Sequence, residues 1–361
     1  MSAAVDVVIV NFNSASDTLA ALASLPLKDC GTVFVVDNSV NADEAQRLRE
    51  NTAHTPQVSL LVCAENLGFG RACNLAFAQS TSDLVLLLNP DAQLRTGALQ
   101  RLRQTLIDNP RLAAVAPRLD WTQEGHIVLP NLVSQSPAAR LWQALMCRWG
   151  ARFRNAFARR GARLAQRCAR DMNAPHTLHA TALSGAVLML RRSAVQRAGG
   201  LFDPAYFMFF EDTDLSQRLT SAGFLLAVEP RACAWHAWRH RADKAALMAA
   251  SEPVYMARHH ASTYALAQQW VPRLFVDPWR DDHSAVPRVS SADDCRRVLG
   301  PLFAITPLPM LHPAGVRPDG VPRLLSDEEW GLMEPGRWYA WVDSDTPHQH
   351  QWLRFDVMSH V

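Results

Sequence analysis

Short apolar runs alternate with helix-like segments through the first hundred residues of the chain. The runs are rich in Val, Ile and Leu and lie at 5–10, 32–36, 58–63 and 84–88. The segments between and after them predict helices at 17–25, 42–50, 71–79 and 97–107. Strands that alternate with helices predict parallel βαβ units, and nearly continuous apolar strands predict a sheet covered on both faces.

Polar side chains follow the end of each of these four predicted strands. They are Asn11, Asp37, the pair Glu65 and Asn66, and the pair Asn89 and Asp91. Ligands of open α/β sheets bind outside the carboxyl ends of the strands. Any one cluster is also explained as a cap or a turn, but the coincidence of four predicts that they converge on one crevice.

The segment 207–215, Phe-Met-Phe-Phe-Glu-Asp-Thr-Asp-Leu, places three carboxylates directly after an aromatic run. Burying a carboxylate is costly unless it is paired, hydrogen-bonded or metal-bound, and neighbouring carboxylates raise at least one pKa. A proton acceptor or a cation site needs such an arrangement. Acidic residues also favour the N-terminus of an ordinary helix, so this segment alone supports both interpretations.

Composition limits the class of protein. The 361 residues are 48% hydrophobic with a net charge of +2, which is typical of a soluble globular protein and gives no global nucleic-acid signature. Seven Cys residues without CxxC pairs indicate neither a disulfide framework nor a zinc knuckle. The N-terminal residues lack a charged signal region and a spanning apolar run. We therefore expect a cytoplasmic location.

The middle of the chain is strongly basic. Residues 125–170 contain nine Arg and no Asp or Glu. Within 134–170, large apolar residues recur at three- and four-residue spacing, namely Trp142, Leu145, Met146, Trp149, Phe153 and Phe157. This pattern predicts an amphipathic basic helix, interrupted at Gly150, that either lies on an anionic membrane surface or packs on the core with an Arg face in water.

Four further elements are expected after this insertion: a strand at 182–190 that contains Ser184 and Gly185, a helix at 215–222, a short strand at 225–228, and a helix ending near 269. Gly185 inside a strand indicates a close backbone approach. From residue 272 Pro is dense, and Trp330, Trp338, Trp341 and Trp352 follow. We predict one domain over 1–270 and an appendage of low regular content over 271–361, whose tryptophans either build a core or stack on glycans.

Seven segments in order resemble the family 2 glycosyltransferases, with the rhamnosyltransferase-like branch closest. They are Val-Asn-Phe-Asn-Ser (10–14), Val-Val-Asp-Asn-Ser (35–39), Glu-Asn-Leu-Gly-Phe-Gly (65–70), Leu-Leu-Asn-Pro-Asp (87–91), Ser-Gly-Ala (184–186), Gly-Gly-Leu-Phe-Asp (199–203) and Phe-Glu-Asp-Thr-Asp-Leu (210–215). The resemblance covers roughly 5–240, without the Arg-rich insertion and the C-terminal segment. It implies a GT-A fold, with a mostly parallel sheet between helices, and inverting transfer from a nucleotide-diphosphate sugar.

The resemblance also implies roles for individual residues. The nucleotide side would be formed by Asn11, Asn13, Asp37, Glu65, Asn66, Gly68, Arg71 and Asn89. The family's Asp-X-Asp metal motif reads Asn89-Pro90-Asp91 here, which leaves Asp91 as its acidic ligand for Mg²⁺ or Mn²⁺. His236 would complete the metal site, although a His between tryptophans is also explained as a packed residue.

The catalytic base implied by the resemblance is Asp212. Glu211 and Asp214 would adjust its pKa or bind acceptor hydroxyls, and Ser184 and Gly185 would lie on the acceptor side. The branch favours dTDP-rhamnose as donor and a glycan, often polyprenyl-linked, as acceptor for cell-surface polysaccharide. Such acceptors are made at the inner face of the membrane, which agrees with peripheral contact through the basic helix.

Two other functions compete with this one. A nucleotidyltransferase would need a glycine-rich, basic segment after the first strand, where this chain has Asn-Phe-Asn-Ser. A catalytically degenerate protein that only binds nucleotide sugar or glycan fits Asn89 in the metal motif, but it would not need the Glu211-Asp212 pair.

Overall fold

The computed structural model describes residues 4–130, 136–138, 141, 150–238, 244–274, 287–307, 315–342 and 351–358. The chain forms two compact units. The first contains Met1–Leu119, Asn131–Ser134 and Ala174–Tyr255, and the second contains Asp120–Pro130, Gln135–Asn173 and Met256–Val361. The domain boundary predicted after residue 270 falls inside helix α9 (Lys244–Leu274).

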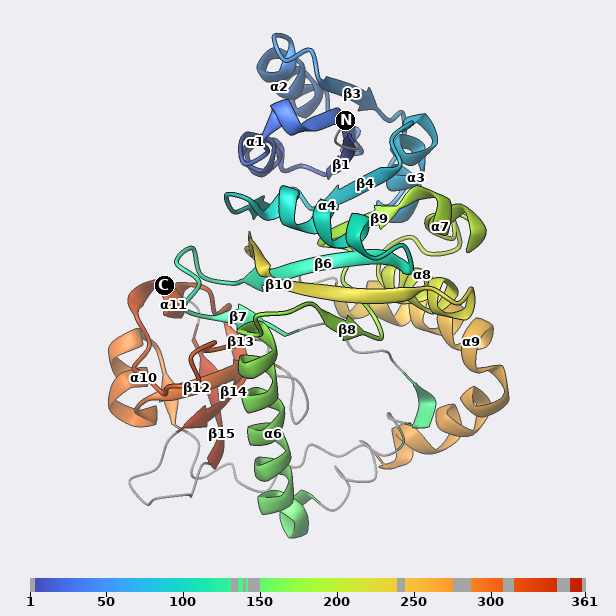
Figure 1. Ribbon diagram of the computed structural model, residues 1–361. Coiled ribbons are helices and arrows are strands. Elements are labelled where there is room, and N and C mark those ends of the chain that lie inside the picture. Colours follow the sequence, from blue (N-terminus) through green and yellow to red (C-terminus); the bar gives the residue numbers. More distant parts are fainter. Residues whose placement is uncertain are drawn as a thin grey trace. The chain divides into compact units, whose positions relative to one another are not determined.

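The first unit is built on a mixed sheet. Its parallel part has the order β3 (Val58–Val62), β2 (Cys30–Asp37), β1 (Val5–Asn11) and β4 (Leu84–Leu88). Next to β4 lie the antiparallel strand β9 (Val187–Arg191) and then β6 (Leu112–Asp120) (Figure 1). Strand β10 (Leu225–His236) pairs with β6, with β5 (Ala92–Leu94) and with β8 (Leu178–Ala180). The α/β fold class predicted from the sequence is confirmed, but the sheet is mixed rather than mostly parallel, because β9, β6, β10, β5 and β8 add antiparallel pairs to the four parallel strands.

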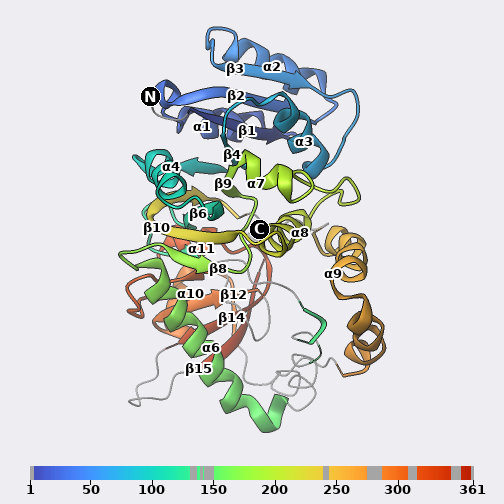
Figure 2. The ribbon, with the colours of Figure 1, turned by 45° about the vertical axis from the view of Figure 1, so that its right-hand side comes forward.

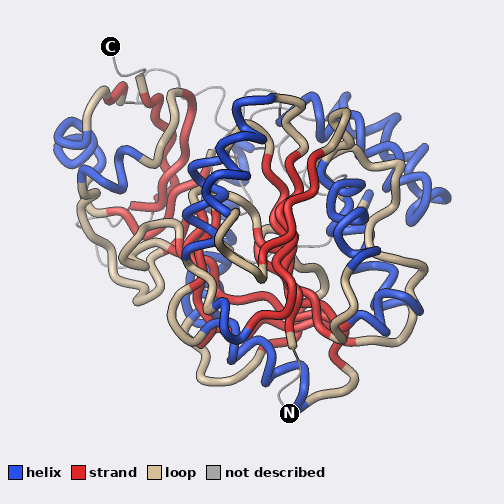
Figure 3. The backbone as a smooth tube through the Cα atoms, turned by 90° about the horizontal axis from the view of Figure 1, so that it is seen from above, coloured by secondary structure: helices blue, strands red, loops and turns tan. Residues whose placement is uncertain are grey.

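Helices cover both sides of this sheet, as Figure 3 shows. In the first unit they are α1 (Ala15–Ala23), α2 (Ala42–Thr52), α3 (Phe69–Gln79), α4 (Ala98–Asp108), α7 (Arg192–Arg197) and α8 (Glu211–Ser221), with a 3-10 turn at Leu27–Asp29. Helices α1 and α4 lie on one side of the β1, β4 and β9 strands, and α3 and α7 lie on the other (Figures 1 and 2). The predicted βαβ order therefore produces a sheet buried on both faces.

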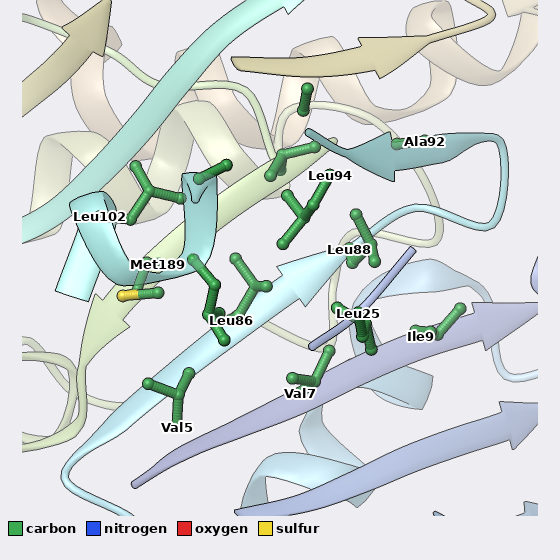
Figure 4. Packing of buried hydrophobic residues seen from close by; sticks show 14 of the residues in the cluster. Val5, Val7, Ile9, Leu25, Leu86, Leu88, Ala92, Leu94, Leu102 and Met189 are labelled. Carbon is green, nitrogen blue, oxygen red and sulfur yellow. The ribbon is translucent and has the colours of Figure 1, made fainter. Parts of the chain in front are cut away.

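The core on the α1 and α4 side follows the two-residue period of the strands. Val5, Val7 and Ile9 of β1 pack there with Leu86 and Leu88 of β4, and all five are buried (Figure 4). Removing an aliphatic side chain of this size from water contributes about 1.5–3 kcal/mol. The intervening residues of β1, such as Val8 and Val10, point to the opposite face and are buried as well.

Three elements of this unit differ from the sequence prediction. The strand expected at 182–190 begins only at Val187, so Ser184 and Gly185 lie in the turn before it. The short strand expected at 225–228 runs on to His236, because Pro230 falls between the residues paired with β8 and those paired with β5. Strands β5, β6 and β8 were not predicted, since two of them have only three residues and β6 carries Ala and Pro.

The strands of the second unit follow one another in the order β11 (Arg288–Val289), β15 (Gln351–Val357), β14 (Gly336–Val342), β12 (Leu302–Thr306), β13 (Gly315–Val316) and β7 (Val128–Leu129). Its helices include α6 (Gly150–Met172), α10 (Ala292–Leu299) and α11 (Asp327–Gly331). The prediction of low regular content after residue 271 was therefore wrong. Dense Pro residues do not prevent regular structure when they lie between the strands.

Tryptophans of the C-terminal segment build the core of this second unit. Trp330, Trp338 and Trp341 are all buried, and Trp338 stacks on Trp121 with ring centres 6.1 Å apart. The Trp341 ring meets the Phe303 ring edge-on at 4.7 Å. Of the two roles considered for these tryptophans, the packing role fits these three, while the side chain of Trp352 lies outside the described residues.

Helix α6 carries the basic pattern seen in the sequence. It begins at Gly150, where an interruption was expected, and its described part exposes Arg159, Arg163, Arg167 and Arg170 along one face. Ala165, Ala169 and Met172 are buried on the other face, and α6 contacts β13, β14 and β15. Most of the predicted apolar stripe at 142–149, and the side chains of Phe153 and Phe157, lie outside the described residues. None of the described helices is both long and apolar enough to cross a membrane.

Candidate active site

The ends of strands β1 and β2 lie level with each other and are joined through Asn11. In the parallel register Asn11 is opposite Asp37. The amide nitrogen of Asn11 donates to Asp37 Oδ1 at 3.0 Å and to Ser39 Oγ at 2.9 Å, and its carbonyl oxygen accepts from Thr18 Oγ1 at 2.9 Å. Asn11 is fully buried, so its role in the structure is to orient Asp37. The other carboxylate oxygen, Asp37 Oδ2, is buried without a hydrogen-bond partner in the described chain.

A second bridge links β2 to the loop after β3. The amide nitrogen of Asn38 donates to Asn66 Oδ1 at 2.9 Å, and Asn38 Oδ1 accepts from the Leu67 N–H at 2.8 Å. Gly68 has φ +77°, and a Cβ added there would lie 2.4 Å from the Phe207 carbonyl oxygen. Only glycine fits this position without strain. Asn38 was not predicted as a site residue, although it directly follows Asp37, the predicted nucleoside contact.

The remaining residues predicted on the nucleotide side lie around these bridges. Asn13 is exposed at φ +51°, and its N–H donates to Ser39 Oγ at 2.8 Å. Glu65 is exposed on the loop after β3. Arg71 is exposed in α3, where its Nε donates to the Pro204 carbonyl oxygen at 3.1 Å. All four polar clusters predicted at strand ends lie at the carboxyl edge of the parallel strands, because β4 also runs parallel to β1.

Asp91 and His236 are brought together by the pairing of β5 with β10. His236 is opposite Ala92 in the antiparallel register, and the Ala237 N–H donates to the Asp91 carbonyl oxygen at 3.0 Å. His236 Nε2 lies 3.3 Å from Asp91 Oδ1. Its Nδ1 atom is buried without a hydrogen-bond partner in the described chain. Asp91 and His236 are 145 residues apart in the sequence, so only the family resemblance predicted that they would lie together.

This pair fits a divalent cation that substrate phosphates also bind. Neighbouring ligand atoms of an octahedral Mg²⁺ site are about 3 Å apart, which is close to the separation of the two side chains. Among the described residues no group of three His, Cys, Asp or Glu gathers as a metal site. A cation here would therefore take its remaining ligands from substrate and water, as Mg²⁺ commonly does.

A hydrogen-bonded turn joins the metal motif to the acidic segment. The Asn89 N–H donates to the Ala186 carbonyl oxygen at 2.8 Å. The neighbouring Gly185 N–H donates to Asp212 Oδ2 at 3.0 Å, and Ser184 Oγ accepts from the Ala186 N–H at 3.3 Å. The residues 184–186 therefore hold Asp212 in a fixed relation to the end of β4.

Glu211 and Asp212 lie in the first turn of α8 and are both withdrawn from water. Burial raises the pKa of Glu211 to about 8, and the charge of Asp212 adds to the rise. Burial also raises the pKa of Asp212, while hydrogen bonds from Gly185 and Thr213 oppose the rise. The Thr213 N–H donates to Asp212 Oδ1 at 2.7 Å, whereas Glu211 Oε2 has no partner in the described chain. Because its pKa is about 8, Glu211 holds a proton at neutral pH.

A strained backbone precedes this pair. Phe209 and Phe210 both have φ +68°, a left-handed conformation that bulky residues rarely adopt. The segment is held in place by α9, because Phe210 packs on Tyr255 at 5.4 Å between ring centres and Ser251 Oγ donates to the Met208 carbonyl oxygen at 2.7 Å. Strain of this kind persists only where surrounding contacts fix it, and it is concentrated at functional sites.

Asp214 has a different environment from the other two acids. It is fully buried, and its Oδ2 accepts from Arg218 Nε at 2.7 Å. Arg218 also donates to the carbonyl oxygens of Ala198 and Gly200, at 2.9 and 2.7 Å. A carboxylate enclosed in this way anchors α8 to the Gly199-Gly200 turn. This placement favours a structural role for Asp214 over the predicted contact with an acceptor hydroxyl.

The family described as "Glycosyltransferase like family 2" matches residues 3–251. The chain belongs to this family, as its seven motifs indicated.

The chain is similar in sequence to two glycosyltransferases. Over 228 residues the chain is 31% identical to an N-acetylglucosaminyl-diphospho-decaprenol L-rhamnosyltransferase of Mycobacterium tuberculosis (strain ATCC 25618 / H37Rv), which covers 58% of this chain and 66% of that protein. It is 32% identical over 135 residues to an N-acetylglucosaminyltransferase of Rhizobium meliloti (strain 1021), covering 36% of this chain and 32% of the relative. The first of these two matches supports the rhamnosyltransferase-like branch.

Two solved structures are also similar. One is a mannosyltransferase from Pyrobaculum calidifontis in complex with GDP-Man and Mn²⁺, with 18% identity, a TM-score of 0.46, and coverage of 74% of this chain and 65% of that chain. The other is GalNAc-T7 with UDP, GalNAc and Mn²⁺, with 12% identity, a TM-score of 0.49, and coverage of 84% and 60%. Since both TM-scores are below 0.5, the family assignment rests on the sequence matches.

Proposed function

We propose that this protein is an inverting, metal-dependent glycosyltransferase that moves rhamnose from dTDP-rhamnose to a lipid-linked glycan for cell-surface polysaccharide. The observation that carries the proposal is the connection from Asn89 through Ala186 and Gly185 to Asp212. The hydrogen bond from Gly185 fixes the Asp212 carboxyl group relative to the metal motif. A protein that only binds nucleotide sugar would not need this carboxylate.

The proposed reaction uses Asp212 as general base. The acceptor hydroxyl oxygen attacks the anomeric carbon of the donor sugar, and its proton passes to an oxygen of Asp212. The bond from the anomeric carbon to the diphosphate oxygen breaks, and its electron pair leaves with the nucleoside diphosphate. Attack from the face opposite the leaving group inverts the configuration. Hydrogen bonds from Gly185 and Thr213 hold Asp212 in place for this transfer.

Asp91 and His236 are the residues that would hold the divalent cation. When bound, Mg²⁺ or Mn²⁺ neutralises the negative charge that develops on the departing diphosphate. An oxygen ligand suits either ion, and the imidazole makes Mn²⁺ a reasonable partner as well. The unpartnered Asp37 Oδ2, which Asn11 orients, supplies a hydrogen-bond acceptor for the nucleoside.

The donor and acceptor assignments rest on relatives. The chain spans 66% of the length of the Mycobacterium tuberculosis proteins, whose name states transfer of L-rhamnose to a decaprenol-linked sugar. A lipid-linked acceptor agrees with the exposed arginines of α6, which would bring the protein into peripheral contact with an anionic membrane at its inner, cytoplasmic face.

The proposal is tested by incubating the purified protein with dTDP-rhamnose and a panel of UDP- and GDP-sugars. We expect Mg²⁺- or Mn²⁺-dependent release of nucleoside diphosphate from dTDP-rhamnose, abolished by EDTA. A lipid-linked N-acetylglucosamine acceptor presented in anionic vesicles should raise the rate more than the same acceptor in neutral vesicles at low salt. No release from any donor while nucleotide binds would favour the degenerate binding protein, and equal rates in both vesicle types would exclude the membrane contact.

A further inference from the structure

The use of lysine in this chain is unusual. Its 36 Lys and Arg residues include only two lysines, Lys28 and Lys244. Lys28 is exposed in the 3-10 turn at Leu27–Asp29. Lys244 is partly buried at the first residue of α9, within the unit that holds the candidate active site. Nearly all of the positive charge of the chain comes from Arg, and Lys244 is one of two exceptions.

Lys244 lies between two aromatic rings that belong to the active-site segments. Its ammonium nitrogen is 5.2 Å from the centre of the Trp238 ring and 5.9 Å from the centre of the Phe209 ring. Trp238 follows the metal-binding candidate His236 by two residues, and Phe209 precedes Asp212 by three. Both aromatic residues have left-handed backbones, with φ +43° at Trp238 and +68° at Phe209. The surroundings therefore hold the two rings in strained positions around the ammonium group.

The charge of Lys244 is not balanced by a carboxylate in the part of the chain that the structure describes. Burial lowers the pKa of Lys244. Cation–π contacts compensate only part of the cost of withdrawing an ammonium group from water. The positive charge of Lys244 would consequently stabilise an anion bound beside it.

We propose that Lys244 binds a diphosphate in the active site, positioned by Trp238 and Phe209. This inference rests on the proposed function, which brings a diphosphate to the site in the donor and a second one in a lipid-linked acceptor. A compact ammonium group acts as a strong point charge on phosphate oxygens, without the planar geometry that Arg requires. The metal motif Asn89-Pro90-Asp91 has one carboxylate fewer than Asp-X-Asp, and Lys244 would supply a positive charge to the diphosphate in addition to the metal.

Amine labelling tests this proposal without any variant, because the chain has only two lysines. Slow reductive methylation followed by mass spectrometry gives separate rates for Lys28 and Lys244. The samples contain dTDP with Mn²⁺, farnesyl diphosphate, or thymidine alone. With a diphosphate at ten times its dissociation constant about a tenth of the sites remain free, so labelling of Lys244 should slow about tenfold. Lys28 should be unaffected, and thymidine should protect neither.

The samples with dTDP and with farnesyl diphosphate distinguish the two sources of diphosphate. Protection by dTDP assigns Lys244 to the donor, and protection by farnesyl diphosphate assigns it to the lipid-linked acceptor. Unchanged labelling of Lys244 in samples where calorimetry shows bound dTDP and bound farnesyl diphosphate would overturn the inference and leave the proposed function standing. If calorimetry shows no binding of any nucleoside diphosphate, both the inference and the proposed function fail.

Binding by variants gives a second readout. Lys244→Gln should weaken diphosphate binding by ~10–100-fold, the range expected for losing a charged hydrogen bond, and should leave thymidine binding unchanged. Lys28→Gln is the matched control and should bind like the wild type. If Lys244→Gln binds both diphosphates as tightly as the wild type, Lys244 only packs between the rings and the inference is wrong.

Discussion

Replacing Asp212 by Asn is expected to lower the turnover number by ~10²–10⁴, the usual value of a general base, while the dissociation constant for dTDP stays the same. Asn keeps the size of the side chain and one oxygen to accept from Gly185 or Thr213, so the turn at 184–186 remains in place. What it removes is the ability to take the proton of the acceptor hydroxyl. The measurement is steady-state transfer together with calorimetric nucleotide binding.

Asp83→Asn is the matched control for this variant. Asp83 is exposed just before β4, so the same chemical change there should leave both turnover and binding unaffected. Wild-type turnover in Asp212→Asn would show that another group accepts the proton. Loss of dTDP binding in this variant would show that Asp212 belongs to the nucleotide site.

The free energy of unfolding of the wild type is expected to fall as the pH rises, because Glu211 ionises. Replacing Glu211 by Gln should remove this fall. The pKa of Glu211 is raised from 4.5 to about 8 in the folded protein, chiefly by burial. Between these two pH values the folded protein binds more protons than the unfolded chain, so its free energy of unfolding falls as pH increases. This contribution is fully present below pH 4.5 and is lost as the pH passes 8. It amounts to at most about 5 kcal/mol.

The measurement is the free energy of unfolding from denaturant titrations between pH 5 and about pH 9, a range set by the two protonation states. The curve of Glu211→Gln should be flatter than that of the wild type, with the largest difference at the alkaline end. The exposed Glu50→Gln in α2 serves as control and should keep the wild-type slope. Parallel curves for wild type and Glu211→Gln would mean that Glu211 is ionised in the folded protein.

The sequence predicted the parallel half of the sheet well, because its signals are local. Strand β4 was predicted at its observed bounds, and β1 and α2 within one or two residues. Apolar runs of β-branched residues and a capping Asn41 act within a few residues of the chain. The resemblance to family 2 glycosyltransferases is also a pattern of short motifs, and family membership confirms it.

The features that were missed depend on contacts between distant residues. Strand β5 has three residues and is defined by its pairing with β10, more than 130 residues later. Strand β10 continues past Pro230 because its pairing partners change there, which no local rule reveals. The contacts of Arg218 with Ala198 and Gly200, and the orientation of Asp37 by Asn11, likewise depend on packing. Sequence reasoning chose the acidic residues but could not separate structural from chemical roles.

The anomeric configuration of the product tests the central claim most directly. If Asp212 activates the acceptor hydroxyl for one displacement, proton NMR of the product formed from dTDP-rhamnose will show a linkage opposite in configuration to the sugar–phosphate bond of the donor. A product that retains the donor configuration would contradict the account, because retention requires a second displacement that Asp212 as a general base does not provide.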